Sequence, residues 1–245
     1  NYGFNGRAAT KRLIAHLEKI KPDVVHLHNL HRHNVHLGLL FRYLKEKQIK
    51  VIWTFHDCWA FTGHCAYFDY VRCDKWKTGC EKCPQKKNYP ASLVMDGSRE
   101  NYEAKRYHFA GIPNLTITVP SHWLAKRVKE SFLGDYPVEV VYNTVNREVF
   151  KPTPGDFRKK HGLENKTILL GVANIWEERK GLKDFAALAP MLEDRYKIVL
   201  VGLTPEQSAI WSYPMKGGGR EEAVFNMCNA LLQRIHQSGH LAEIP

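Results

Sequence analysis

The sequence predicts an α/β protein with two parallel β-sheets, and three observations support this fold class. Short apolar strand patterns alternate with amphipathic helix patterns in two series along the chain. The strand patterns, such as "KVIWTF" and "YKIVLVG", are nearly continuous apolar runs, which are typical of parallel strands buried on both faces. The segment 144–157, "TVNREVFKPTPGDF", has two prolines, a glycine and no hydrophobic period, so we interpret it as a linker between two domains.

The first series predicts a Rossmann-like domain at residues 1–143. Its helix patterns lie at 7–20, at about 35–47, near 98–110 and from Ser121 onward. Its strand patterns are "DVVHLHNL", "KVIWTFHD", "NLTITVPS" and "VEVVYN". A cysteine-rich insertion at 57–97 follows the second strand.

The second series predicts the start of another Rossmann-like domain at 158–207. It consists of the strand "TILLGVAN", the helix "GLKDFAALAPML" and the strand "YKIVLVG". Residues 208–245 do not fit the pattern, because they offer one helix at about 221–236 and no further strand. We therefore expect both domains to be incomplete and the tail to be atypical, as in a frameshifted or fragmentary gene product.

Charge and hydropathy limit the environment of the chain. A formal net charge of +11 would suit nucleic acid, an anionic membrane surface or phosphorylated ligands. The basic residues are interspersed with acidic and apolar ones, so a solvated basic surface explains the charge equally well. No apolar run is long enough to cross a bilayer, and the first residues lack the apolar core of a secretory signal. We expect a cytoplasmic protein, in which disulfides are disfavoured.

The insertion concentrates five of the six cysteines. Cys65, Cys73, Cys80 and Cys83 have the spacing C-x7-C-x6-C-x2-C, and a short C-x2-C pair with two further thiolates suits a tetrahedral metal. Structural zinc is one interpretation; reduced thiols packed among aromatic residues, or a disulfide, are the others. Catalytic zinc is disfavoured because four thiolates leave no open coordination position. A nucleophilic pair of Cys58 with a nearby histidine is the least favoured interpretation.

Polar residues follow the predicted strands of the first domain, where ligands bind in open parallel sheets. They are His28, Asn29 and His31 after the first strand, His56 and Asp57 after the second, and Pro120 and Ser121 after the third. Any single histidine is as readily explained by a structural hydrogen bond. Because these strand ends meet at one sheet edge, His56 is the strongest candidate for a functional side chain.

In the second domain, "GVANIWEERKGLKDF" leads from a strand into a helix. Arg179 and Lys180 stand immediately before Gly181 at the predicted helix start. Two cations and a helix amino end form a good receptor for a diphosphate. A basic turn that faces solvent is the alternative.

Five segments together resemble one enzyme family: "HDCWAFTGHC", "CDKWKTGCEKCPQ", "PSHWLA", "VVYNTVNREVFKP" and "GVANIWEERKGLKDF". In this order they are similar to bacterial glycosyltransferases of family 4, which have the GT-B fold, from the branch that builds capsular polysaccharides and exopolysaccharides. The resemblance runs from about residue 3 to residue 207. It implies retaining transfer of a sugar from a nucleotide-diphosphate donor to a glycan or lipid-linked acceptor hydroxyl, in a cleft between two Rossmann-like domains. It implies no metal requirement.

The resemblance also implies roles for individual residues. Arg179, Lys180 and Gly181 correspond to the element that holds the donor diphosphate and stabilises its departure. His56 corresponds to the cleft histidine that approaches the donor sugar. Asn143 matches the first residue of the family's Asn-Gly-hydrophobic-Asp element, although Thr144 replaces its glycine and Asn146 its aspartate.

The family pattern is not fully present. Its opening strand and glycine-rich loop, and its C-terminal pair of glutamates spaced by seven residues, have no counterpart in this sequence. We therefore expect impaired activity, and contact of the basic protein with an anionic membrane face is a further expectation. Two other functions remain open: a zinc-stabilised nucleic-acid-binding module, which the βα alternation disfavours, and a nucleotide-sugar-binding remnant without catalysis.

Overall fold

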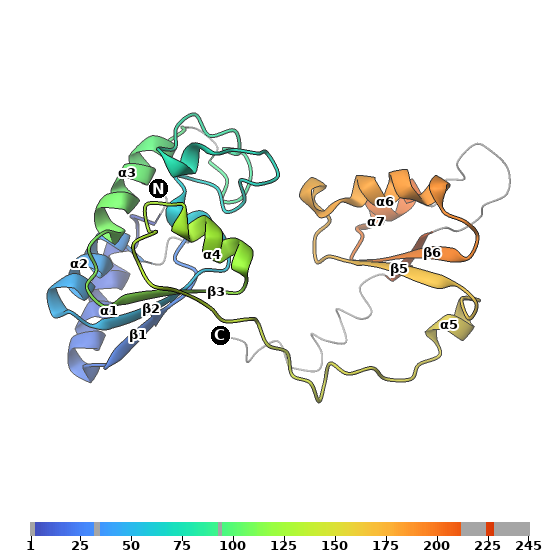
Figure 1. Ribbon diagram of the computed structural model, residues 1–245, viewed down its shortest axis with the longest axis horizontal. Coiled ribbons are helices and arrows are strands. Elements are labelled where there is room, and N and C mark those ends of the chain that lie inside the picture. The colour runs from blue at the N-terminus through green and yellow to red at the C-terminus, as the bar shows by residue number, and fades with distance from the viewer. Residues whose placement is uncertain (1–2, 32–34, 93–94, 212–223, 228–245) are drawn as a thin grey trace. The chain divides into compact units, whose positions relative to one another are not determined.

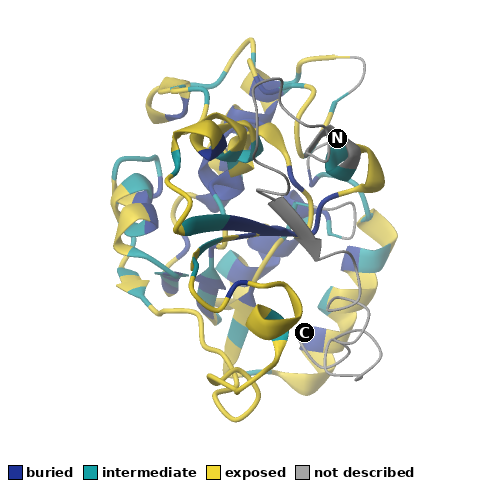
Figure 2. Cartoon of the chain, turned by 90° about the vertical axis from the view of Figure 1, so that its right-hand side faces the viewer, coloured by how far each residue is buried: buried dark blue, intermediate teal, exposed yellow. Residues whose placement is uncertain are grey.

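The computed structural model describes residues 3–31, 35–92, 95–211 and 224–227 (Figure 1). The chain divides into two compact units, Asn1–Arg147 and Glu148–Pro245. The division falls within the segment 144–157 that the sequence suggests as a linker. Residues 141–156 are exposed throughout and contain no regular element (Figure 2).

The first unit is built on a four-stranded parallel sheet with the strand order β1-β2-β3-β4. Its strands are β1 (Val24–Leu27), β2 (Lys50–Thr54), β3 (Leu115–Val119) and β4 (Val138–Val140). Its helices are α1 (Arg7–Ile20), α2 (Leu37–Lys47), α3 (Ser98–Phe109) and α4 (His122–Lys129), with short 3-10 turns η1 (Trp59–Phe61) and η2 (Lys75–Lys77) in the insertion. The predicted α/β class with parallel strands is confirmed.

Side-chain caps define where two of these helices begin. His36 precedes α2, and its Nδ1 accepts a hydrogen bond from the Leu39 amide at 3.3 Å. Ser121 precedes α4, and its hydroxyl accepts from the Leu124 amide at 3.2 Å. Each side chain satisfies an amide that the first helical turn leaves unpaired. Ser121, a candidate at the third strand end, therefore has a capping role.

Aromatic packing around Trp53 fixes the centre of the sheet. Its ring lies 5.0 Å from Phe41 on α2, 4.8 Å from Phe55 and 4.9 Å from Phe109 at the end of α3, measured between ring centroids. All four side chains are buried, and burying each large apolar side chain stabilises the fold by roughly 1.5–3 kcal/mol. The Trp53 indole also donates to the carbonyl of His28 at 3.2 Å. The core thus holds the backbone that follows β1 in place.

Tyr136 ties the segment before β4 to the end of α3. Its hydroxyl donates to the Phe109 carbonyl at 2.6 Å and accepts from the Ile112 amide at 2.9 Å. One of these backbone groups belongs to the last residue of α3 and the other to the loop before β3. One side chain therefore satisfies two groups that secondary structure leaves unpaired.

The second unit has a three-stranded parallel sheet with the order β5-β6-β7. Its strands are β5 (Thr167–Val172), β6 (Tyr196–Val201) and β7 (Val224–Met227). Its helices are α5 (Phe157–Lys160), α6 (Leu182–Leu188) and α7 (Pro205–Trp211), with 3-10 turns η3 (Glu178–Lys180) and η4 (Ala189–Met191). A cluster around Trp176, Ile198 and Leu200 forms its core.

The strand β7 corrects one sequence prediction. A helix was expected at about 221–236, but Val224–Met227 pairs in parallel with β6. The β-branched and aromatic pair that begins this segment favours an extended backbone, and β6 offers it an edge with unpaired hydrogen-bonding groups. The rest of the predicted helix lies outside the described residues.

A search of the described residues for membrane-spanning segments found no helix with sufficient length and apolar character to cross a bilayer.

Candidate functional site

The carboxyl ends of β1 and β2 bring two predicted histidines together. His28 follows β1 and His56 follows β2, and these strands are neighbours in the sheet. His28 Nδ1 lies 3.0 Å from His56 Nε2, and the two rings stack with a centroid separation of 5.3 Å. A hydrogen bond between two imidazoles needs a lone pair on one of them, so at least one ring of the pair is neutral. Burial, followed by the charges of His26 and His56, lowers the pKa of His28.

Behind this pair, a line of hydroxyls continues across the sheet. His26 Nε2 lies 2.8 Å from the Thr54 hydroxyl, which is 2.6 Å from the Thr118 hydroxyl on β3. The ring of His26 also contacts that of His28, at 4.2 Å between centroids. His26 was not among the predicted residues. Its position two residues before His28, on the same face of a strand, is the signal that could have identified it.

A second polar group lies beside the first at the same sheet edge. His31 Nε2 lies 3.1 Å from Asp57 Oδ2, and His31 Nδ1 lies 3.1 Å from the Tyr89 hydroxyl. The side chains of His31 and Asp57 are only 8% and 11% exposed. The other carboxylate oxygen of Asp57 accepts from the Trp59 amide at 2.9 Å, so the same residue fixes the turn after β2. Tyr89 comes from the insertion, and no sequence pattern indicates it.

The edge therefore presents imidazole and hydroxyl groups rather than a cluster of carboxylates. Asp57 is held by His31 and by the backbone, so the exposed His28 and His56 are the side chains best placed to meet a ligand. Neutral imidazoles can accept a proton or donate a hydrogen bond to a sugar hydroxyl. Asn29 is exposed at the same edge and Asn143 is exposed beyond β4.

In the second unit, the basic pair lies on the 3-10 turn η3, just before α6. Arg179 Nε pairs with the Glu177 carboxylate at 2.8 Å. Lys180 is exposed and forms no ion pair with a described residue. Gly181 has φ +77°, in the left-handed region, and α6 then begins at Leu182. The helix therefore begins where the sequence predicts it, directly after Gly181, and the left-handed glycine separates η3 from α6.

Close packing fixes the backbone that leads to η3. A Cβ atom on Gly202, which has φ +90° after β6, would lie 1.8 Å from the Ala173 carbonyl oxygen. The buried Trp176 donates its indole N–H to the Val201 carbonyl at 2.9 Å. Gln207 on α7 donates to the Trp176 carbonyl at 3.0 Å. The loop after β5 is therefore held by β6 and α7, and it presents Arg179 and Lys180 from a fixed base.

The four predicted metal-ligand cysteines line one small pocket in the insertion of the first unit. All are reduced, and the Cys65 and Cys83 thiols hydrogen-bond to each other. That bond lowers the pKa of Cys83 to about 7 and, with burial, raises the pKa of Cys65. Burial raises the pKa of Cys80 to about 11. As the thiols stand, the described residues contain no group of three or more metal-ligand side chains arranged to hold an ion.

Cys58 lies apart from that pocket. It is 2% exposed, and burial raises its pKa far above the ordinary range of a thiol. A nucleophilic cysteine needs a lowered pKa. The environment of Cys58 therefore disfavours its role as a nucleophile paired with His56.

Comparisons with known proteins agree with the geometry of the first unit. The model of the family described as "Glycosyltransferase Family 4" matches residues 3–149. The protein named "Putative colanic acid biosynthesis glycosyl transferase WcaC", from Escherichia coli strain K12, is 37% identical over 93 residues. The match covers 36% of this chain and 22% of that relative. The chain therefore spans less than a quarter of the length of the curated relative that it matches. Because the family model covers more than half of the chain and the parallel sheet agrees with it, the chain belongs to glycosyltransferase family 4.

Proposed function

We propose that this chain takes part in retaining transfer of a hexose from a nucleotide-diphosphate donor to a hydroxyl of a glycan or lipid-linked acceptor. The observation that carries the proposal is the family match over residues 3–149, which includes the imidazole pair at the carboxyl edge of the sheet. By analogy with the Escherichia coli relative, the product belongs to polysaccharide biosynthesis. The proposed location is the cytoplasm, at the membrane face that supplies lipid-linked acceptors.

In the proposed reaction, the bond between the anomeric carbon and the diphosphate oxygen breaks, and the acceptor oxygen bonds to the anomeric carbon. The hydroxyl proton leaves, and the sugar retains its anomeric configuration. Arg179 and Lys180 would bind the diphosphate and stabilise the negative charge that develops as it departs. Arg179 would exchange its contact with Glu177 for the phosphate, whereas the side chain of Lys180 has no ion pair to a described residue to give up.

His56 would act on the sugar rather than on the phosphates. Two neutral imidazoles have two N–H groups and two lone pairs, and the contact between His28 and His56 uses one of each. One N–H and one lone pair remain for a substrate. The proposed role is a hydrogen bond to a sugar hydroxyl that strengthens as the anomeric carbon becomes positive. Asn143 and Gly181 are proposed to contact the donor through the amide side chain and the backbone.

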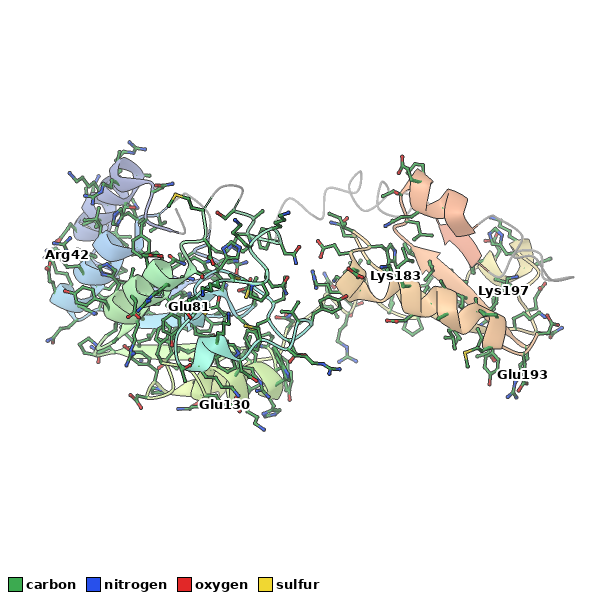
Figure 3. All side chains as sticks on the ribbon, turned by 90° about the horizontal axis from the view of Figure 1, so that it is seen from above. Arg42, Glu81, Glu130, Lys183, Glu193 and Lys197 are labelled. Atoms are coloured by element: carbon green, nitrogen blue, oxygen red, sulfur yellow. The ribbon has the colours of Figure 1, made fainter. Side chains whose placement is uncertain are left out.

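Nucleotide binding tests the diphosphate assignment without knowledge of the sugar. The Kd values of UDP and GDP are measured by calorimetry for the wild type, Lys180→Ala and the control Lys183→Ala. Lys183 lies on α6 (Figure 3) and already pairs with Glu178 at 2.9 Å. A charged hydrogen bond contributes about 1.5–3 kcal/mol, so Lys180→Ala should weaken binding roughly tenfold or more. Equal effects of the two variants would remove Lys180 from the site.

Transfer activity tests the histidine. With donor hexoses of both nucleotides and a lipid-linked acceptor pool, His56→Asn should lower the transfer rate and leave the Kd of the nucleotide unchanged. The control is His16→Asn, since His16 is exposed on α1. A wild-type rate in His56→Asn would refute its role. Product with inverted anomeric configuration would refute the retaining mechanism.

A further inference from the structure

The pocket in the insertion gathers four thiols from separate points of the chain. Cys65, Cys73, Cys80 and Cys83 line it, together with His64. Its interior volume is about 10 Å³, which is close to the space that a single water molecule needs. Glu81, labelled in Figure 3, marks the turn between Cys80 and Cys83. A pocket of this size with four sulfurs in its wall fits an ion rather than an organic ligand.

The backbone around the pocket approaches the cysteine side chains closely. Backbone hydrogen bonds reach Cys80 from Gly63 and Cys83 from Gln85. A Cβ atom on Gly63 would lie 2.6 Å from Cβ of Cys80 and 2.1 Å from the carbonyl oxygen of Ser98. Only glycine permits so close an approach. Amides directed at thiolates are the outer-shell contacts that tune a metal–sulfur centre.

A buried cation beside the pocket supplies independent evidence. Lys105 on α3 is 0% exposed. Its ammonium donates to the carbonyls of Trp59 at 2.6 Å and Thr62 at 2.9 Å. It lies 3.3 Å from the centroid of a Trp59 ring. These contacts satisfy its N–H groups but carry no negative charge, and a buried charge normally needs an anionic partner.

Metal-bound cysteines can supply the anionic partner. Burial lowers the pKa of Lys105 well below its ordinary value, and negative charge on Cys80, Asp57 and Cys65 acts in the opposite direction. The carboxylate of Asp57 is already hydrogen-bonded to His31 and to the Trp59 amide. Four thiolates around one divalent cation carry a net charge of −2, and such a centre would offset the ammonium from inside the fold. Neutral thiols would leave Lys105 without that compensation.

The loop has little regular structure of its own. Between η1 and α3, the described residues contain η2 as their one regular element, and Trp76 and Phe68 anchor them to the core of the first unit. A metal cross-link would hold the turns between these anchors and lower the conformational entropy of the loop. In the absence of a metal, the Cys65 and Cys83 thiols hydrogen-bond to each other. Deprotonation and rotation of the side chains about Cα–Cβ would direct the sulfurs at one centre.

We propose that Cys65, Cys73, Cys80 and Cys83 bind one structural Zn²⁺ as a tetrathiolate, with Lys105 as its buried counter-charge. Binding replaces four S–H bonds by four Zn–S bonds and releases four protons, and no oxidation occurs. The centre is closed, so it takes no part in sugar chemistry. Through Lys105, it would fix the carbonyls of Trp59 and Thr62, at the two ends of the turn that follows the site residues His56 and Asp57.

Metal analysis of the full chain, purified under reducing conditions, tests the proposal. We expect one zinc per chain, and after exchange for Co²⁺ the absorption bands of a tetrahedral thiolate site. Cys73→Ser and Cys80→Ser should lose the metal and the bands, whereas Cys58→Ser, outside the pocket, should keep both. Circular dichroism shows whether each variant is folded. A folded wild type without zinc that gives no cobalt spectrum overturns the proposal whatever the variants do. So does a Cys65–Cys83 disulfide in the reduced preparation.

The counter-charge is tested separately. Competition with a chromophoric chelator gives the zinc affinity of the wild type, Lys105→Met and the exposed control Lys87→Met. Lys105→Met should weaken zinc binding at least tenfold, because a buried anionic centre then loses its cation. Lys87→Met should change it less than twofold, since solvent screens an exposed charge. Equal affinities for all three proteins would overturn the role of Lys105.

Discussion

The cap of α2 makes the stability of the first unit depend on pH. His36 is 8% exposed, and its Nδ1 accepts from the Leu39 amide at 3.3 Å. Burial and the charge of Arg7 lower the pKa of His36 below its ordinary 6.5, and Arg42 (Figure 3) contributes in the same direction. His108 on α3 is the other titratable group that faces it. The folded state therefore favours the neutral ring.

The sign follows from this lowered pKa. Below pH 6.5 the unfolded chain binds the proton more readily than the folded chain, so the free energy of unfolding falls as the pH decreases. Stability from the neutral ring is fully present above 6.5 and is lost as the pH falls through the folded pKa. A protonated Nδ1 also cannot accept from the Leu39 amide. An N-cap contributes about 0.5–2 kcal/mol, and a contact of 3.3 Å suggests the lower half of that range.

The variant His36→Asn isolates this contribution, because an asparagine accepts the same hydrogen bond at any pH. Urea unfolding is followed by tryptophan fluorescence, since Trp53 packs on α2. Between about pH 7.5 and 5.5, the wild type should lose about 0.5–1 kcal/mol more than His36→Asn, a midpoint difference of roughly 0.3–0.5 M at an m-value near 2 kcal/mol/M. His16→Asn should behave as the wild type. Parallel pH profiles for the wild type and His36→Asn would refute the reasoning.

Two backbone predictions follow from the same structure. Gly202→Ala should destabilise the second unit by about 2–5 kcal/mol, from the left-handed φ and the collision with the Ala173 carbonyl. Gly162→Ala, with φ +62° and no atom within 4 Å of its Cβ, should cost only about 1–2 kcal/mol; equal losses in thermal unfolding would contradict this assignment. Tyr136→Phe should lower the free energy of unfolding by about 1–3 kcal/mol in urea, because two backbone groups lose their partner. An unchanged midpoint would show that water replaces the hydroxyl.

The sequence predicted the sheet well because the rule behind it is local. An apolar run favours a strand whatever its distant partners, so β1, β2, β3, β5 and β6 lie within the predicted strand patterns, although β5 leaves Leu170 and Val172 exposed. The meeting of His28 and His56 also followed, since it depends only on two adjacent parallel strands ending at one edge. The position of Gly181 at the start of α6 followed from the sequence, whereas the 3-10 turn η3 before it did not, because its backbone angles are not encoded in composition.

Contacts made by the insertion could not be predicted from pattern. The helix α3 reads "SRENYEAKRYHF", in which Lys105 resembles the charged residues that stay in solvent. Its burial arises only because the insertion folds over that face of the helix and offers two carbonyls. Tyr89 likewise reaches His31 from 58 residues away. Such pairings depend on the path of a loop with few regular elements, and periodicity carries no information on that path.

The turn η1 links the candidate site to the cysteine pocket. On one side Asp57 holds the Trp59 amide and His31, and on the other side Lys105 holds the Trp59 carbonyl. Trp59 thus contacts the candidate site through its amide and the region of the cysteine pocket through its carbonyl. If the proposed zinc centre balances the charge of Lys105, loss of the metal should first release the Trp59 carbonyl, and Asp57 would then hold His31 from a less ordered turn. Metal removal should therefore weaken the ordering of His31 before it disturbs the His28–His56 contact, which rests on β1 and β2.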